Sequence, residues 1–288
     1  MATLLKGTQL AGVVQDALRD TVEKLTAQFN SVPKVVAVSV GENQASQLYL
    51  RNQKMVAKKV GIVHETIQYE PDIDEAALCA AIAGLNVDPE VHGIILQMPL
   101  PEHISAGRVL EKLLPIKDVE GITADNLGLL LLGKNAPKPC TALAAMELID
   151  ACDVDLYGKE AVVVGASKIV GEPVALMLMQ RMATTTVCTI GTSERGMLEN
   201  HVRRAEVLVV AVGKADVIPG EWVKEGAIVI DVGINRVNGK TVGDVCFEEA
   251  EKRAAYISPV PGGVGPLTVS MLMRNVVHVF ECQKRCKG

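Results

Sequence analysis

Two patterns of hydrophobic and polar positions alternate along the chain. Short continuous apolar runs, such as residues 35–40, are typical of strands buried in a parallel sheet. Longer stretches with apolar residues three and four apart indicate amphipathic helices. In the first half we expect strands near 35–40, 62–69 and 92–97 and helices over 8–28, 46–60, 74–86 and 105–114. This strand–helix alternation predicts a parallel sheet covered by helices.

The alternation breaks at residues 129–139, where Gly133, Asn135, Pro137 and Pro139 predict a domain boundary. Beyond it we expect a helix over 142–152, strands at 161–164, 185–189, 207–212 and 227–231, a helix ending near 182 and a last helix over 266–284. The predicted fold class is therefore α/β, with two parallel α/β domains. The first covers 1–138 and is completed by the C-terminal helix 266–288, and the second, Rossmann-like domain covers 139–265.

Composition narrows the class of protein. The 288 residues are 49% hydrophobic and 22% charged, with a net charge of −5, and no basic run suggests a nucleic-acid partner. No stretch approaches 18 uninterrupted apolar residues, so we expect no membrane span. Seven cysteines, an odd number in mostly apolar settings, suggest free thiols in the cytoplasm. Only Cys282 and Cys286 are closely spaced, without matching histidines, so we expect no metal.

One stretch combines three prolines with three glycines. Residues 258–268 read Ser-Pro-Val-Pro-Gly-Gly-Val-Gly-Pro-Leu-Thr and lead into the last helix. Proline fixes φ and glycine frees it, so the loop has a prescribed shape with exposed backbone. A ligand against this backbone is one interpretation, and an elaborate interdomain turn is the other.

A glycine-rich turn follows the strand at 161–164. Gly165, Ser167 and Gly171 lie between this strand and a helix, where small residues let a phosphate approach backbone N–H groups. The spacing differs from G-x-G-x-x-G, so a close-packed turn without a ligand is the alternative. The next strand ends at residues 188–193 without the carboxylate typical of NAD sites or the arginine typical of NADP sites.

In the first half, polar residues fall where ligands commonly bind. Ser46, Tyr49 and Gln53 share one face of a predicted helix. Gln97 ends a buried strand, and residues 117–121 (Lys-Asp-Val-Glu-Gly) form a charged turn. Taken singly, each could also be an ordinary polar helix face, a strand cap or a solvated loop.

Together, these stretches resemble the methylenetetrahydrofolate dehydrogenase/cyclohydrolase family. The matching motifs occur in order at Ser46-x-x-Tyr49, 97–101 (Gln-Met-Pro-Leu-Pro), 117–121, 139–141 (Pro-Cys-Thr), 164–171, 231–236 (Asp-Val-Gly-Ile-Asn-Arg), 242–245 and 259–266. The resemblance implies a folate-type catalytic domain, a Rossmann-like nucleotide-binding domain, a cleft between them and a homodimer. It also implies oxidation of 5,10-methylenetetrahydrofolate by NADP, followed by hydrolysis of the methenyl product to 10-formyltetrahydrofolate.

The resemblance also implies site residues. The expected catalytic residues are Tyr49, Gln53, Gln97 and Glu120. The expected folate contacts are Ser46, Tyr49, Gln97, Met98, Pro99, Leu100, Glu120, Pro261, Gly262 and Gly263. The expected cofactor contacts are Gly165, Ala166, Ser167, Ile169, Ile234 and Thr268.

Three positions depart from the family pattern. Gln53 stands where the family has its catalytic lysine, and glutamine carries no proton or charge at neutral pH. The neighbouring Lys54 would reach that position only through a helical bulge. Glu120 replaces the aspartate that contacts the pterin, and Thr189 and Ile190 replace a cationic residue, so NAD is possible beside NADP.

These departures lead to a ranked prediction. We expect a dehydrogenase whose cyclohydrolase activity is weak or absent. The alternatives are a paralogue that binds folate or nucleotide without turnover, and an enzyme acting on a related one-carbon carrier.

Overall fold

The computed structural model describes residues 1–41 and 43–285, and its chain divides into two compact units. Unit 1 comprises Met1–Ala11 and Pro139–Thr268, and unit 2 comprises Gly12–Lys138 and the chain from Val269 onward. The first eleven residues therefore lie in unit 1, which corrects the expectation that all of 1–138 belongs to one domain. The physical reason is strand β1 (Thr3–Leu4), which pairs with β11 (Tyr256–Ile257) of unit 1.

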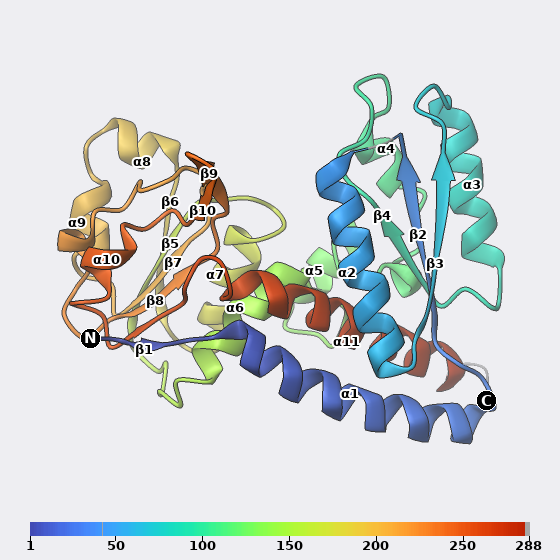
Figure 1. The fold of residues 1–288 in the computed structure, drawn as a ribbon, viewed down its shortest axis with the longest axis horizontal. Coiled ribbons are helices and arrows are strands. Elements are labelled where there is room, and N and C mark those ends of the chain that lie inside the picture. The colour runs from blue at the N-terminus through green and yellow to red at the C-terminus, as the bar shows by residue number, and fades with distance from the viewer. Residues whose placement is uncertain (42, 286–288) are drawn as a thin grey trace. The chain divides into compact units, whose positions relative to one another are not determined.

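Unit 2 is built on a three-stranded parallel sheet. Its order is β3-β2-β4, from β2 (Lys34–Val40), β3 (Val63–Tyr69) and β4 (Gly93–Leu96). Alternate side chains of β2 and β4 pack against buried residues of α3 (Glu75–Val87) and α4 (Ala106–Leu110). Helix α2 (Gln44–Val60) lies on the other side of this sheet from α3 (Figure 1).

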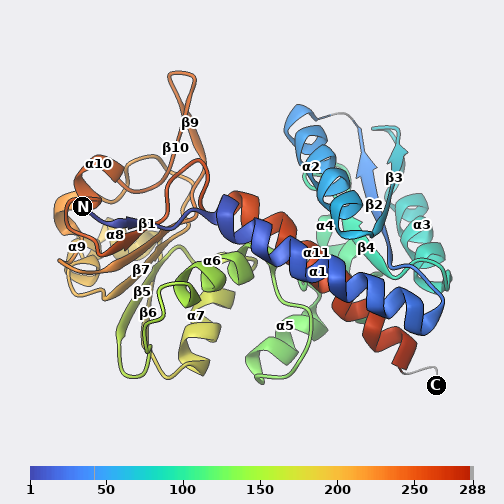
Figure 2. The same cartoon turned by 60° about the horizontal axis from the view of Figure 1, so that its bottom comes forward.

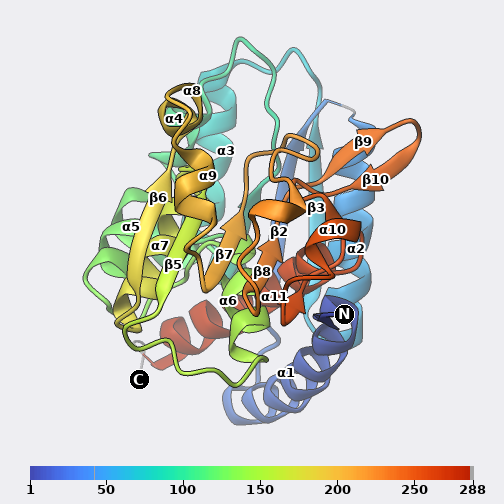
Figure 3. The same ribbon diagram turned by 90° about the vertical axis from the view of Figure 1, so that its left-hand side faces the viewer.

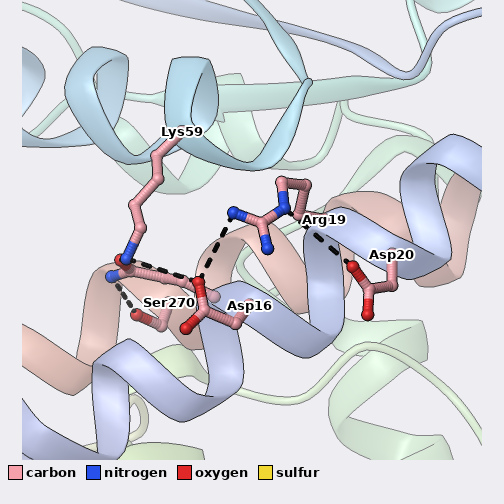
Figure 4. A network of polar contacts seen from close by, with 6 residues as sticks. Asp16, Arg19, Asp20, Lys59 and Ser270 are labelled. Atoms are coloured by element: carbon pink, nitrogen blue, oxygen red, sulfur yellow. Dashed lines mark hydrogen bonds and ion pairs between the residues drawn. The ribbon is translucent and has the colours of Figure 1, made fainter.

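The two long helices α1 (Gly7–Phe29) and α11 (Val264–Arg285) also pack in unit 2. Gln15 Nε2 donates to Ser270 Oγ over 2.9 Å, and Lys59 Nζ donates to Gln15 Oε1 over 2.9 Å. Lys59 also lies 3.8 Å from Asp16, which Arg19 approaches to 3.7 Å (Figure 4). These contacts join α1, α2 and α11 and so hold the C-terminal end of α2 in place.

Unit 1 contains a six-stranded sheet in the order β1-β11-β8-β7-β5-β6, with every neighbouring pair parallel. Its other strands are β5 (Glu160–Val164), β6 (Thr184–Cys188), β7 (Val207–Val210) and β8 (Ile228–Asp231), which lie side by side in Figure 3. The unit's helices are α6 (Cys140–Asp150), α7 (Gly171–Gln180), α8 (Ile190–Glu194), α9 (Leu198–Val202) and α10 (Phe247–Ala250). The antiparallel hairpin of β9 (Asn235–Val237) and β10 (Lys240–Val242) projects from this unit (Figure 2).

The two parallel sheets confirm the predicted α/β fold class, and most predicted elements are present. The helix expected over 105–114 is wrong in length, because α4 ends at Leu110 and continues as turns before Pro115. The prediction also missed α5 (Ala124–Leu131), the short helices α8, α9 and α10, the β9–β10 hairpin and the two-residue strands β1 and β11. In the described part of the chain, no helix is long and apolar enough to cross a membrane.

Candidate active site

Gln97 directly follows β4, at the carboxyl end of the unit 2 sheet. Its Nε2 donates to the Met98 carbonyl over 3.2 Å, and the Ser46 hydroxyl donates to the same carbonyl over 3.0 Å. A carbonyl only accepts hydrogen bonds, so these contacts fix the direction of the Gln97 amide. Its Oε1 is buried and has no hydrogen-bond partner among the described residues. Gln97 thus presents a hydrogen-bond acceptor to a ligand, whereas the Ser46 hydroxyl fixes the backbone of the loop after β4.

Gln53 lies on the same face of α2 as Ser46 and Tyr49, one further turn on. Tyr49 is half-buried and Gln53 is completely buried. The Gln53 Oε1 lies 3.2 Å from His64 Nε2 on β3, and its Nε2 has no partner in the part of the chain that the structure describes. A buried amide NH₂ without a partner is rare in folded proteins, so the Gln53 Nε2 points to a ligand or an ordered water.

Lys54 does not replace the missing lysine. Helix α2 is regular from Gln44 to Val60, and the Lys54 side chain is exposed. The helical bulge that would turn Lys54 to the face of Gln53 is therefore absent from α2, whose backbone is described throughout.

The charged turn at 117–121 has two structural residues and one that faces the site. Lys117 is buried and donates to the carbonyls of Leu85 (2.8 Å) and Asp88 (2.5 Å), which caps α3. Asp118 is fully buried and accepts from the backbone N–H groups of Glu120, Gly121 and Thr123. These contacts shape the turn that carries Glu120.

Glu120, in the same turn, has a carboxyl group with a strongly raised pKa. Burial raises the pKa of the Glu120 carboxyl to about 8, and the Asp118 charge adds to the rise. The Leu96 backbone N–H, which faces the carboxylate, opposes it. Because Leu96 precedes Gln97, the two side chains belong to the same end of β4. At neutral pH the ligand-free carboxyl is mostly protonated.

The other expected folate contacts in unit 2 lie in the loop after β4. Met98 and Pro99 are exposed, with Met98 46% accessible, and Leu100 packs partly on the core. Unit 2 therefore contains an acceptor at Gln97, a buried amide at Gln53, a titratable carboxyl at Glu120 and an exposed apolar loop after β4.

In unit 1, the turn after β5 is tightly packed. A side chain at Gly165, whose φ is +109°, would meet the Ala211 carbonyl, and one at Gly171 would meet the Gly165 carbonyl. The Ser167 hydroxyl accepts from Val170 and Gly171 N–H groups at 3.2 and 3.4 Å. Both glycines thus allow the close packing of this turn.

The same turn still fits a diphosphate. The backbone N–H groups of residues 166–169 make no hydrogen bond within the described chain, and they lie at the N-terminal end of α7. Ser167 and Ile169 are exposed. Four free donors at a helix N-terminus suit an anion such as the diphosphate of a dinucleotide.

The loop at 258–268 borders a small cavity of unit 1. Residues 259–266, together with 231–234 and Thr241, line a volume of about 130 Å³. Gly262 has a φ of +105°, and a side chain at Gly263 would lie 2.6 Å from the Pro259 carbonyl oxygen. Helix α11 begins at Val264, and the Thr268 hydroxyl donates to the Val264 carbonyl inside it, over 3.2 Å.

Two buried aspartates support this cavity. Asp231 accepts from the N–H groups of Gly233, Asp244 and Val245, and Asp244 accepts from those of Val212, Gly213 and Lys214. Burial raises the pKa of Asp231 to about 7 against these hydrogen bonds, and the Asp244 charge contributes to the rise. The sequence motifs contained both residues, but nothing in their spacing showed that they meet.

The end of β6 carries no positive charge where the family usually has one. Thr189 and Ile190 follow Cys188, and the Ile190 side chain is 75% exposed. The nearest cations along the chain are Arg195, which is exposed, and Arg181, which pairs with Asp150 at 3.0 Å. Arg204 reaches β6 itself, where it donates to the Thr186 hydroxyl over 2.6 Å.

Comparison with known proteins agrees with this geometry. Residues 5–120 match the tetrahydrofolate dehydrogenase/cyclohydrolase catalytic domain, and residues 139–284 match the NAD(P)-binding domain of the same proteins. The chain belongs to the tetrahydrofolate dehydrogenase/cyclohydrolase family. "Bifunctional protein FolD 2" of Myxococcus xanthus is 44% identical over 277 residues, covering 96% of this chain and 95% of that protein.

Two solved structures of the family are close to this fold. The bifunctional enzyme FolD of Campylobacter jejuni superposes with a TM-score of 0.94 at 41% identity, covering 98% of this chain and 99% of that one. The Trypanosoma brucei FolD, complexed with NADP and an inhibitor, gives a TM-score of 0.92 at 37% identity, covering 98% of each chain. The resemblance that the motifs suggested is thereby confirmed.

Among the described residues, no three His, Cys, Asp or Glu side chains are grouped to hold an ion. Of the closely spaced pair of cysteines, Cys282 Sγ lies 3.8 Å from His278 Nε2 and Cys286 lies outside the described residues.

Proposed function

We propose that this protein oxidises 5,10-methylenetetrahydrofolate to 5,10-methenyltetrahydrofolate, with NADP as the hydride acceptor. The observation that carries the proposal is the family match over both units, one to a catalytic domain and the other to an NAD(P)-binding domain. The relatives with that full-length match are named bifunctional FolD proteins.

The unit 2 residues are proposed to bind and orient the folate. The Gln97 Oε1 accepts a hydrogen bond from the ligand, and its direction is already set by Met98. Glu120, once ionised, accepts from the N–H groups of the pterin edge. Tyr49, Ser46 and the loop 98–100 border the same ligand, and residues 261–263 of unit 1 are further proposed contacts.

The unit 1 residues are proposed to hold NADP, which supplies the hydride acceptor when bound. The free N–H groups at 166–169 bind its diphosphate, and Gly165 keeps the turn close to the sheet. Ile234 and Thr268 are proposed to contact the cofactor. The Thr268 hydroxyl already donates a hydrogen bond to the Val264 carbonyl, so it can only accept one from the cofactor.

The second activity of the family, cyclohydrolysis, is proposed to be weak or absent. Hydrolysis of the methenyl group needs water activation and proton transfer. Gln53 is a neutral amide bound to His64, and Lys54 is exposed on another helix face. Glu120 is mostly protonated below about pH 8 and is a poor base there.

A paired assay tests the proposal. The purified protein is given methylenetetrahydrofolate with NADP or NAD, and separately methenyltetrahydrofolate, with absorbance followed in each case. We expect rapid reduction of NADP and slow hydrolysis of the methenyl compound. No reduction of either nucleotide would refute the dehydrogenase activity and favour a paralogue that only binds its ligands. Fast hydrolysis would refute the proposal that cyclohydrolase activity is weak or absent.

A cytoplasmic homodimer completes the proposal. Strand β6 is an edge of the unit 1 sheet, and Thr184 and Val187 on it are exposed. Cys79, Cys152, Cys188 and Cys246 carry free thiols, which suits a reducing compartment. Sedimentation of the purified protein measures the oligomeric state, and a monomer at micromolar concentration would exclude the dimer.

A further inference from the structure

Gln53, which is completely buried, and His64, which is half-buried, form a pair of polar side chains between α2 and β3. Gln53 comes from the middle of α2 and His64 from the second residue of β3. Their facing atoms, Oε1 and Nε2, are 3.2 Å apart. The two remaining polar atoms, Gln53 Nε2 and His64 Nδ1, are buried without a hydrogen-bond partner in the described residues.

The direction of the Gln53 amide depends on where the His64 ring carries its proton. If the proton is on Nε2, the ring donates to Gln53 Oε1, and the amide NH₂ is left for a ligand. If the proton is on Nδ1, the amide must turn, donate to Nε2 and leave its oxygen for a ligand. The two states therefore offer a ligand opposite hydrogen-bonding groups.

The surroundings of His64 favour the first state. Burial lowers the pKa of His64, and the Lys54 charge adds to this, so the ring is neutral and has one N–H; its own backbone carbonyl opposes the shift. That carbonyl does not reach hydrogen-bond geometry with Nδ1. In either state the free side of the Gln53 amide can be completed by a ligand or a water, so the two states differ at Nδ1. The first state leaves a buried acceptor there and the second a buried N–H, and orphaned N–H groups are the rarer kind.

Resting on the proposed function, we infer that His64 is a positioning residue that donates from Nε2 to Gln53 Oε1 and so directs the Gln53 NH₂ toward an acceptor atom of the folate. Gln53 then contributes to folate binding, although it cannot move a proton. Gln97 offers the opposite group, an acceptor fixed by Met98. The pair of glutamines thus distinguishes acceptor from donor atoms on one ligand.

The tautomer can be measured in the unaltered protein. Nitrogen-15 NMR of the histidine rings separates Nε2–H from Nδ1–H, and His64 is assigned by its loss in His64→Gln. We expect the Nε2–H form in the ligand-free protein. The Nδ1–H form would overturn the inference, whether or not any variant folds.

Variants then test whether His64 acts through Gln53. Replacing His64 by Leu removes the donor, and we expect the KM for folate to rise about tenfold, which corresponds to one lost hydrogen bond. The KM for NADP and the melting temperature should change little. His64→Gln keeps a donor at a similar reach and should restore most of the affinity. Thr66→Val, an exposed change on the same strand, is the matched control.

A double variant decides the mechanism. In the background of Gln53→Ala, the further change His64→Leu should raise the folate KM by less than about twofold, because its target is gone. A full tenfold rise in that background would show that His64 acts elsewhere and would overturn the inference. Failure of the unaltered protein to reduce NADP would instead refute the proposed function, so the two failures are distinguishable.

Discussion

At the scale of single residues, the polar side chains of the site have neighbours that the structure identifies. Gln53 is held by His64, Gln97 by Met98, and Glu120 lies beside the Leu96 N–H. Each polar group is thus directed by a neighbour. The chemistry that remains is hydrogen bonding at Gln53 and Gln97 and titration at Glu120.

The first residue-scale prediction concerns the missing lysine. Gln53→Lys places a protonatable amine on the correct face of α2, and the neutral His64 ring can accept from it. We expect methenyltetrahydrofolate hydrolysis to rise on the order of 10²-fold, the usual contribution of one general acid–base group. Stopped-flow loss of the methenyl absorbance measures this. Arg51→Lys, on the exposed face of the same helix, should leave the rate unchanged.

A pH dependence follows from Glu120. Its pKa of about 8 means that ligand binding to the carboxylate must release a proton at neutral pH. We expect kcat/KM for folate to rise with pH up to about 8 and then level off. Initial rates measured across this pH range test the prediction, and Glu120→Gln should abolish the rise of kcat/KM with pH. An unchanged rise in that variant would show that another group titrates.

The same shift affects stability with a defined sign. Because the pKa of Glu120 is raised from 4.5 to about 8, the folded protein binds more protons than the unfolded chain between these pH values. The free energy of unfolding therefore falls as pH rises through this window, and Glu120→Gln should flatten the slope in urea titrations.

Cofactor choice is also decided by single residues. Ile190 is exposed directly after β6, where an arginine would accept the 2′-phosphate of NADP. We expect Ile190→Arg to raise the preference for NADP over NAD by about 10- to 100-fold, the range for a hydrogen bond to a charged group. The ratio of kcat/KM for the two nucleotides measures it, with Met197→Arg, a partly exposed change nearby, as the control.

At the scale of elements, α11 holds the turn that carries Glu120. Asn275 is buried and donates to the carbonyls of Val119 (2.8 Å) and Lys138 (2.9 Å). Asn275→Leu removes both bonds, and we expect a loss of about 1–3 kcal/mol in unfolding free energy. Folate KM should rise as well, because the turn loosens. Glu281→Gln, which breaks only the partly exposed pair with Arg285, should cost under about 0.5 kcal/mol.

The elements also show what a sequence can reveal. Runs such as residues 35–40 alternate so clearly with helical stretches that the long elements were predicted within a few residues. The two-residue strands β1 and β11 are too short to have a period, and their pairing depends on residues far apart in sequence. The Gln53–His64 pair was missed for a related reason, because the packing of α2 on β3 brings the two side chains together.

At the scale of the whole molecule, each unit is assembled from separate stretches of chain. Buried residues of α11, such as Leu272, Val276 and Phe280, belong to unit 2 although they follow all of unit 1 in sequence. A chain ended after Thr268 should therefore lose the cooperative unfolding of unit 2. Circular dichroism against temperature measures this loss.

The single tryptophan provides the control for that experiment. Trp222 lies in unit 1, so its fluorescence reports on this unit alone. We expect its transition to survive in the shortened chain while the helical signal of unit 2 disappears. Retention of two full transitions would show that α11 is dispensable for unit 2.

The interleaving of the units also has a consequence for biosynthesis. β1 is made long before its partner β11, and the unit 2 part of α11 follows all of unit 1 in sequence. Neither unit can complete its native packing until these later segments have left the ribosome. The nascent protein must therefore carry the uncovered apolar surface that α11 will bury until α11 has been made, which is the period when a holding chaperone would protect it from aggregation.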